Sequence, residues 1–137
     1  MSGVRPQVNQ IESHPFLPNQ LLVDFCLQNS VLPMAYCPLA RGRCLQSEVI
    51  QSIAEKREVT GGQVALKWLL SRGLAVIPMT SRVERLRENL ELGFELSEEE
   101  VRQISALNCG QKSQRISLLD KHKINELKEW PFNESQQ

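Results

Sequence analysis

The sequence predicts an α/β fold with about three parallel strands and flanking helices. Short apolar runs typical of strands alternate with segments whose apolar residues recur at helical spacing. The run LAVIP at 74–78 is apolar throughout, which favours a strand buried on both faces of a parallel sheet. Three such strands could form a small domain of their own, or part of a barrel whose other strands are absent from this sequence.

The three predicted strands lie near residues 6–12, 32–36 and 74–78. The first, PQVNQIE, alternates weakly between polar and apolar residues, and the second, LPMAY, is a short apolar run. A loop, CPLARGRC, follows the second strand. We expect the strands to run parallel because helical segments separate them.

Two helices are predicted from the residues that precede them. Asn19 can cap a helix over 20–29, and Ser47 can cap the helix that follows the loop. The apolar residues expected on the buried faces are Leu22, Phe25 and Cys26 in the first helix, and Val49, Ile50, Ile53 and Ala54 in the second.

Three further helices begin at capping boxes, in which the N-cap side chain and the side chain three residues later each bind the other's backbone N–H. The boxes are Thr60 with Gln63, Ser81 with Glu84, and Ser97 with Glu100. Gly73 and Gly110 are predicted to end the first and third of these helices, and the second runs to about Leu92. The predicted core faces are Val64, Ala65, Trp68 and Leu69, then Val83, Leu86 and Leu90, then Val101, Ile104 and Leu107.

Composition excludes several classes of function. The 137 residues carry 16 Lys+Arg and 16 Asp+Glu, so no broad field favours nucleic acid or a membrane surface. No apolar run is long enough to span a bilayer, and the first ten residues have no apolar core typical of a signal peptide. The four cysteines lack C-x-x-C spacing and the histidines, His14 and His122, lie far apart, so we expect no metal site, reduced thiols and a cytoplasmic location.

The strand–turn–helix at 74–92 is a candidate anion site. The strand would deliver the hydroxyl groups of Thr80 and Ser81 to a helix N-terminus, where unpaired N–H groups favour negative charge. Arg82 and Arg85 lie near one helical face, and guanidinium groups can bind a phosphate through two hydrogen bonds. The alternative is a solvated helix whose glutamates balance its arginines.

Four segments resemble the aldo-keto reductase family. IPMT at 77–80, followed by Arg85, Glu88 and Asn89, is similar to the family pattern I-P-K-S with a later R-x-x-E-N. The others are VNQIESHPF at 8–16, MAYCPLARG at 34–42 and GGQVALKWLLSRG at 61–73. The resemblance covers about residues 4–108 and has its motifs in the family's order.

The resemblance implies an NADP(H) site at 77–89. Thr80 and Arg85 would contact the 2′-phosphate, with Ser81 and Arg82 beside them. Glu88 and Asn89 would contact the adenine. Met79 stands where many members have lysine, and Arg82 could partly replace that charge.

The other motifs imply the nicotinamide end of the same site. Gln10 matches the glutamine that binds the carboxamide, and Tyr36 matches the aromatic residue that stacks on the ring. Cys37, where serine is usual, and the retained Pro38 and Leu39 continue this motif. The alternative to these cofactor roles is a structural one: Gln10 could be a buried amide paired with backbone, and Tyr36 could be a core residue. His14 is interpreted as a structural residue that fixes the loop before Pro15.

The family fold is a (β/α)8 barrel, and the matched segments are its last three strands. We therefore expect residues 1–110 to form the C-terminal part of the barrel and 111–137 a tail, with an amphipathic helix at 118–129. Strands without neighbours would favour self-association. The residues expected on the uncovered face are Val8, Ile11, Met34, Ala35, Val76 and Ile77.

The family's catalytic aspartate, tyrosine, lysine and histidine match no position in this sequence. The resemblance therefore predicts an NADP(H)-dependent carbonyl reductase that is truncated, keeps its cofactor residues and would act on a small carbonyl only in a full-length form. The alternative is a non-catalytic remnant that binds a cofactor or a protein.

Overall fold

The structure is a computed structural model that describes residues 4–109. Its three-stranded sheet has the order β1-β2-β3, and both strand pairs are parallel. The strands are β1 (Val8–Glu12), β2 (Leu32–Tyr36) and β3 (Ala75–Val76). In the register, Gln10 lies opposite Met34, and Met34 lies opposite Ala75. The predicted parallel α/β fold is confirmed.

Two of the strands are shorter than predicted. Pro6 has no N–H to donate, and the first pairing bond before β1 runs from the Leu32 N–H to the Gln7 carbonyl at 2.9 Å. At the other end, the Ile77 N–H still donates to the Ala35 carbonyl at 3.2 Å. Pro78 follows, and its missing N–H ends the pairing.

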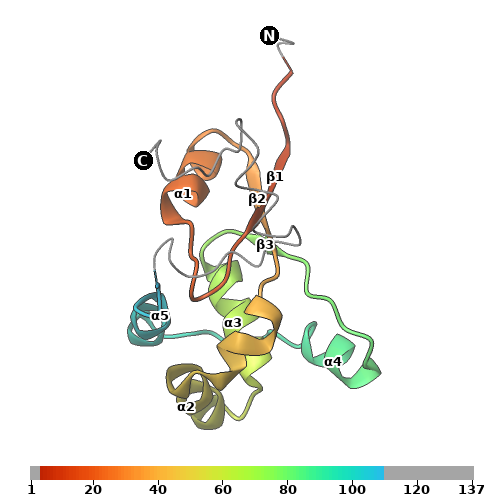
Figure 1. The fold of residues 1–137 in the computed structure, drawn as a ribbon, viewed down its shortest axis with the longest axis vertical. Coiled ribbons are helices and arrows are strands. Elements are labelled where there is room, and N and C mark those ends of the chain that lie inside the picture. The colour runs from red at the N-terminus through yellow and green to blue at the C-terminus, as the bar shows by residue number, and fades with distance from the viewer. Residues whose placement is uncertain (1–3, 110–137) are drawn as a thin grey trace, which may run out of the picture.

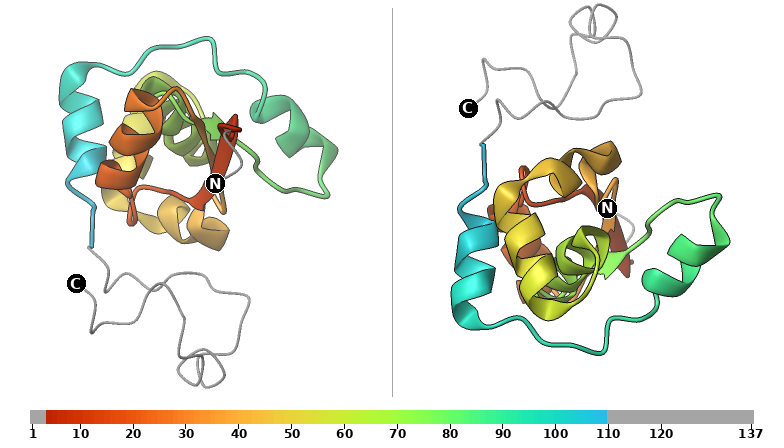
Figure 2. Two further views of the ribbon diagram at one scale, coloured as in Figure 1. Left: turned by 90° about the horizontal axis from the view of Figure 1, so that it is seen from above. Right: turned by 90° about the horizontal axis from the view of Figure 1, so that it is seen from below.

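The helices lie mainly on one side of this sheet, with α4 on the other (Figure 1). They are α1 (Gln20–Gln28), the 3-10 helix η1 (Ala40–Gln46), α2 (Glu48–Arg57), α3 (Gly61–Ser71), α4 (Val83–Glu88) and α5 (Glu98–Ser105). α1 contacts β2, α3 contacts β3, and α2 packs between α3 and α5. Figure 2 shows α4 and α5 on opposite sides of this body, with α4 set apart from it.

The core lies between the helix-covered face of the sheet and α3. Trp68 is fully buried, and its indole Nε1–H donates to the Ser105 hydroxyl of α5 at 3.1 Å. The guanidinium of Arg72 covers the same ring at 4.4 Å from its centre. The predicted α3 face is confirmed, since Val64, Ala65, Trp68 and Leu69 are all buried.

The opposite face of the sheet is open. Val8, Leu32, Tyr36 and Ile77 are exposed on it. Ile11, Ala35 and Val76 point to the helix-covered face, where Ile11 and Ala35 are buried and Val76 packs against the core, so the prediction that they lie uncovered is wrong. The physical reason is the two-residue repeat of a strand, which sends neighbouring side chains to opposite faces.

Two of the three capping boxes are confirmed. The Thr60–Gln63 and Ser97–Glu100 pairs each form both reciprocal hydrogen bonds. The Ser81–Glu84 box is wrong, because α4 begins at Val83 and its N-cap position is held by Arg82 without a side-chain bond. Thr80 accepts the Arg82 N–H at 3.1 Å, and this local turn precedes the helix start.

The predicted core face of α4 is also wrong. Val83, Leu86 and Leu90 are 60%, 50% and 85% exposed, and α4 buries none of its residues. The apolar spacing correctly indicates one side of a helix, but burial also needs a neighbouring element. Within residues 4–109, no element covers that side.

The α1 and α2 predictions hold in outline. Asn19 and Ser47 occupy the N-cap positions, but neither caps through its side chain. The Asn19 amide donates instead to the Glu12 carbonyl at 2.6 Å. α1 buries Val23 and Cys26, whereas the predicted Leu22 and Phe25 are exposed. In α2, Ile50, Ile53 and Ala54 are buried as expected and Val49 is half-buried.

Three segments differ in extent from the prediction, and one of them is α4, which ends at Glu88 rather than near Leu92. The loop after β2 contains η1, which is interrupted at Arg41 and Gly42, where φ is 55° and 86°. α5 ends at Ser105 rather than Gly110. The chain turns away there, and the Cys109 N–H bonds to the Phe16 carbonyl at 3.2 Å. The predicted helix at 118–129 and the tail from 111 lie outside the described residues.

Candidate functional site

A cleft of about 840 Å³ lies between two segments that are far apart in sequence. One wall is the end of α2, the connection to α3 and the first turn of α3. The other wall is the segment from Met79 through α4 to Asn89. The floor includes Leu39 and Leu45, which come from the region after β2. The cleft therefore adjoins the C-terminal ends of β2 and β3.

The cleft brings together about half of the predicted site residues. They are Leu39, Thr80, Arg82, Arg85, Glu88 and Asn89. Gln10, Tyr36, Cys37, Pro38 and Ser81 do not line it. The division follows the two predicted ends of the cofactor site except at two residues: Ser81 of the phosphate end does not line the cleft, and Leu39 of the nicotinamide motif does.

Arg82 and Arg85 supply the positive charges of the α4 wall, where Glu84 and Glu88 supply two negative ones. Both side chains are exposed, and within residues 4–109 neither guanidinium forms an ion pair or a side-chain hydrogen bond. Thr80 is half-buried beside them. α4 has only six residues, so its helix dipole adds little, contrary to the sequence-based expectation of a helix-end anion site. The guanidinium groups remain as the donors suited to a phosphate.

Hydrogen bonds at both ends hold the α4 segment in place. Before it, the Ile77 N–H donates to the Ala35 carbonyl of β2. After it, the Gln63 side-chain amide donates to the Glu91 carbonyl at 2.8 Å. Lys67 donates to the Leu92 carbonyl at 3.3 Å. α4 is thus positioned by its anchors rather than by buried side chains.

The wall formed by α2 and α3 was not predicted from the sequence. Glu55, Glu58 and Thr60 line the cleft there, together with Gly61 and Gly62. A Cβ at Gly61 would lie 3.2 Å from Cγ2 of Ile50, so this position is tightly packed, whereas a Cβ at Gly62 would make only ordinary contacts. Two adjacent glycines are unfavourable in the first turn of a helix. This Gly61–Gly62 pair was the one feature of the sequence that could have pointed to this wall.

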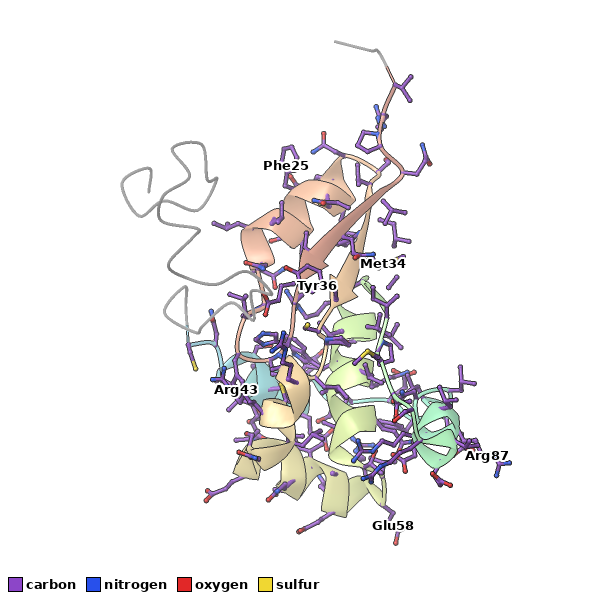
Figure 3. All side chains as sticks on the ribbon, turned by 45° about the vertical axis from the view of Figure 1, so that its right-hand side comes forward. Phe25, Met34, Tyr36, Arg43, Glu58 and Arg87 are labelled. Atoms are coloured by element: carbon purple, nitrogen blue, oxygen red, sulfur yellow. The ribbon has the colours of Figure 1, made fainter. Side chains whose placement is uncertain are left out.

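Gln10 and Tyr36 lie on the open face of the sheet. Gln10 is exposed, and its side-chain amide contacts the Met34 sulfur at 3.7 Å. Tyr36 is 37% exposed, so neither residue is plain core. Figure 3 shows Met34 and Tyr36 beside the strands, well away from Glu58 at the connection between α2 and α3.

The remaining titratable candidates are structural. His14 is only 2% exposed and lies 3.4 Å from the Glu12 carboxylate, in agreement with its interpretation as a loop-fixing residue. Burial raises the pKa of the Cys44 thiol to about 12, which makes it a poor nucleophile. In the part of the chain that the structure describes, no three His, Cys, Asp or Glu side chains gather as a metal site. No helix there is long and apolar enough to cross a membrane.

Comparison with known proteins identifies related sequences. Residues 1–109 match the model described as "Aldo/keto reductase family". The chain is 39% identical to glyoxal reductase of Bacillus subtilis, over 82% of this chain and 40% of the relative. It is 34% identical to glycerol 2-dehydrogenase (NADP(+)) of Hypocrea jecorina, over 98% of this chain and 43% of the relative.

Solved structures show the same likeness. The aldose reductase from Schistosoma japonicum is similar with a TM-score of 0.82 and 31% identity, over 96% of this chain and 42% of that one. A mutant of Gox0644 in complex with NADPH is similar with a TM-score of 0.80 and 36% identity, over 85% of this chain and 43% of that one. The chain thus spans less than half the length of these proteins.

Proposed function

The chain belongs to the aldo/keto reductase family, and on this premise we propose that it forms the cofactor site of an NADP(H)-dependent carbonyl oxidoreductase. Its fold is the C-terminal part of a (β/α)8 barrel. Relatives named for NADP-dependent activity and a neighbour in complex with NADPH support the choice of cofactor.

One observation carries the proposal for the adenosine end of the cofactor. Two guanidiniums without an ion pair among the described residues, Arg82 and Arg85, line one cleft together with the Thr80 hydroxyl. This donor set fits a phosphate. We propose that Thr80 and Arg85 hold the 2′-phosphate with Arg82 and Ser81 near it. Glu88 and Asn89, both half-buried, would hold the adenine.

The nicotinamide end is proposed on the open face of the sheet. Gln10 can donate and accept hydrogen bonds with a carboxamide, and the exposed ring of Tyr36 can stack on a flat heterocycle. Cys37, Pro38 and Leu39 lead from Tyr36 toward the cleft floor. This path would connect the two ends of one extended dinucleotide.

When bound, the nicotinamide cofactor supplies a hydride. Gln10 and Tyr36 would orient its ring, but neither is a proton donor tuned to neutral pH. The resemblance leads us to expect no counterpart of the family's catalytic tetrad among these residues, and we therefore propose that the 137-residue chain alone reduces no carbonyl. A longer protein containing it would act on small carbonyl compounds. The second candidate is a non-catalytic cofactor- or protein-binding unit, and it rests on the same expectation.

Fluorescence titration of the purified chain with NADPH tests the cofactor assignment. We expect saturable binding that Arg85→Ala weakens. Arg87→Ala is the matched control, because Arg87 lies on the same helix but does not line the cleft, and Figure 3 shows it projecting away from the body. Failure of NADPH to bind the folded wild-type chain would reject the proposal.

An NADPH consumption assay with a panel of aldehydes and ketones separates the two candidates. We expect no turnover from the chain alone. Turnover abolished by Tyr36→Phe or His14→Gln would show an active site within these residues and contradict the non-catalytic expectation. Turnover that neither substitution changes would indicate a contaminating host reductase.

The remaining assignments are proposed on the same basis. We propose residues 1–110 as the partial barrel and 111–137 as a separate tail. A cytoplasmic location is proposed from the expectation of reduced thiols. The open face of the sheet supports a further proposal, that the isolated chain self-associates.

A further inference from the structure

We propose that Glu55 and Glu58 weaken the preference of the cleft for a 2′-phosphate, so that the chain accepts NADH with an affinity close to that for NADPH. This inference rests on the proposed cofactor function and concerns its specificity. It assigns a role to the α2–α3 wall, which the family resemblance leaves without one.

The charges lining the cleft carry the inference. Arg82 and Arg85 supply two positive charges, and four glutamates supply four negative ones, which leaves a formal charge of −2. The glutamates are Glu55, Glu58, Glu84 and Glu88. None of these six side chains forms an ion pair within residues 4–109. The field in the cleft is therefore not that of a dedicated dianion site.

Glu55 and Glu58 lie on the wall that faces the arginines across the cleft. Glu55 is in the last turn of α2, and Glu58 ends that helix with φ 55° and ψ 38°. A residue other than glycine is uncommon in this left-handed conformation. The chain nevertheless places a carboxylate there, beside the first turn of α3.

The two cofactors differ in what they present to these carboxylates. A 2′-phosphate carries nearly two negative charges and is repelled by them. A free ribose hydroxyl is neutral and can donate a hydrogen bond to a carboxylate, the arrangement by which acidic residues select NAD in other folds. Met79, which is 96% exposed beside the arginines, adds no compensating positive charge.

The solvent exposure of Glu55 and Glu58 limits how strongly their charges affect NADPH binding. Glu55 and Glu58 are exposed, so water and salt screen their interaction with a phosphate. We expect removal of one charge to strengthen NADPH binding about three- to tenfold at low salt. NADH binding should change little or weaken. The change should shrink in about 0.5 M salt because the charges are then screened.

The experiment measures the Kd of NADPH and of NADH for the wild-type chain and for Glu58→Gln, by fluorescence titration at two salt concentrations. Glutamine keeps the size and the backbone demand of glutamate and removes only the charge. Glu55→Gln is the second variant, since Glu55 lies within regular helix. Glu98→Gln is the control, because this exposed residue of α5 does not line the cleft.

We expect the wild-type Kd values to agree within about tenfold, and Glu58→Gln or Glu55→Gln to shift the ratio toward NADPH by about three- to tenfold. A wild-type preference for NADPH above about a hundredfold would overturn the inference, as would an unchanged ratio in both variants. Either result leaves the proposed function intact, because NADPH still binds. Binding of neither cofactor would overturn both.

Discussion

The Gln63 side chain donates through Nε2 to the Glu91 carbonyl oxygen at 2.8 Å, and so joins the start of α3 to the segment that follows α4. The same amide accepts the Thr60 N–H through Oε1 at 2.9 Å. One buried side chain therefore completes a helix cap and fastens one wall of the cleft to the other. Because α4 buries no side chain of its own, its position depends on such anchors.

Replacing Gln63 by alanine should loosen the cleft as well as the fold. The substitution removes both bonds of the side chain, and we expect the free energy of unfolding to fall by about 1–2 kcal/mol. NADPH binding should weaken too. Urea denaturation and fluorescence titration measure the two effects. Gln103→Ala, which removes an exposed bond to Glu99, is the control, and equal losses in both variants would contradict the anchoring role.

The buried carboxylate of Glu100 predicts a dependence of stability on pH. The hydrogen bonds from Arg57 lower the pKa of Glu100 from 4.5 to about 2, against the opposing effect of burial. A lowered pKa in the folded state means that the stabilisation is complete above pH 4.5 and declines as the pH falls toward 2. Glu100→Gln should therefore lower Tm at neutral pH by about 5 °C or more.

Thermal unfolding from pH 7 to pH 2 checks this prediction. The Tm difference between wild type and Glu100→Gln should narrow as the pH falls below 4.5. Glu99→Gln is the matched control, because Glu99 pairs with Arg102 at the surface and both side chains are exposed. A Tm difference that stays constant with pH would show that the charge of Glu100 contributes nothing.

The cysteines should differ sharply in reactivity. Cys44 is buried and its pKa is raised to about 12, so almost no thiolate forms at pH 8, whereas Cys109 is exposed. Alkylation with iodoacetamide followed by mass spectrometry should label Cys109 first. Cys44 should react only after denaturation. Equal labelling of the two in the folded chain would mean that the core around η1 is not formed as described.

The open face of the sheet should drive self-association of the 137-residue chain. Leu32 is 43% exposed on this face, and a lysine there would have to be desolvated in any interface. Sedimentation velocity should show association in the wild type and less in Leu32→Lys. Leu21→Lys is the control, because Leu21 is 88% exposed on α1. A monomeric wild type, or an equal effect of both substitutions, would count against this surface.

Features that depend on residues close together in the sequence, such as capping boxes, could be predicted from the sequence. The Thr60 and Ser97 boxes each need residues only three positions apart, and both form. The two wrong predictions for α4, its capping box and its buried face, failed because they depend on structure beyond the local pattern. Ser81 can cap only if the helix starts next to it, and the competing turn at Thr80 moves that start to Val83. The spacing of apolar residues in α4 does not say whether another element covers them.

Only one wall of the cleft, the α4 wall, could be predicted from the sequence. The motif residues Thr80 and Arg85 lie close in sequence, so their pattern identifies the α4 wall. Glu58 reaches the cleft because of how α2 and α3 pack, and no spacing in the sequence expresses that arrangement. Gln10 and Tyr36 were assigned by resemblance, and the structure places both at the solvent-exposed face of the sheet.

The most direct test of the central claim is the affinity of Arg85→Ala for NADPH compared with its affinity for NADH. If Arg85 holds the 2′-phosphate, the loss of a charged hydrogen bond should weaken NADPH binding by about 1.5–3 kcal/mol and leave NADH nearly unchanged. Arg87→Ala should alter neither affinity. Equal weakening of NADPH and NADH, or no change in either, would contradict the assignment of this cleft to the cofactor phosphate.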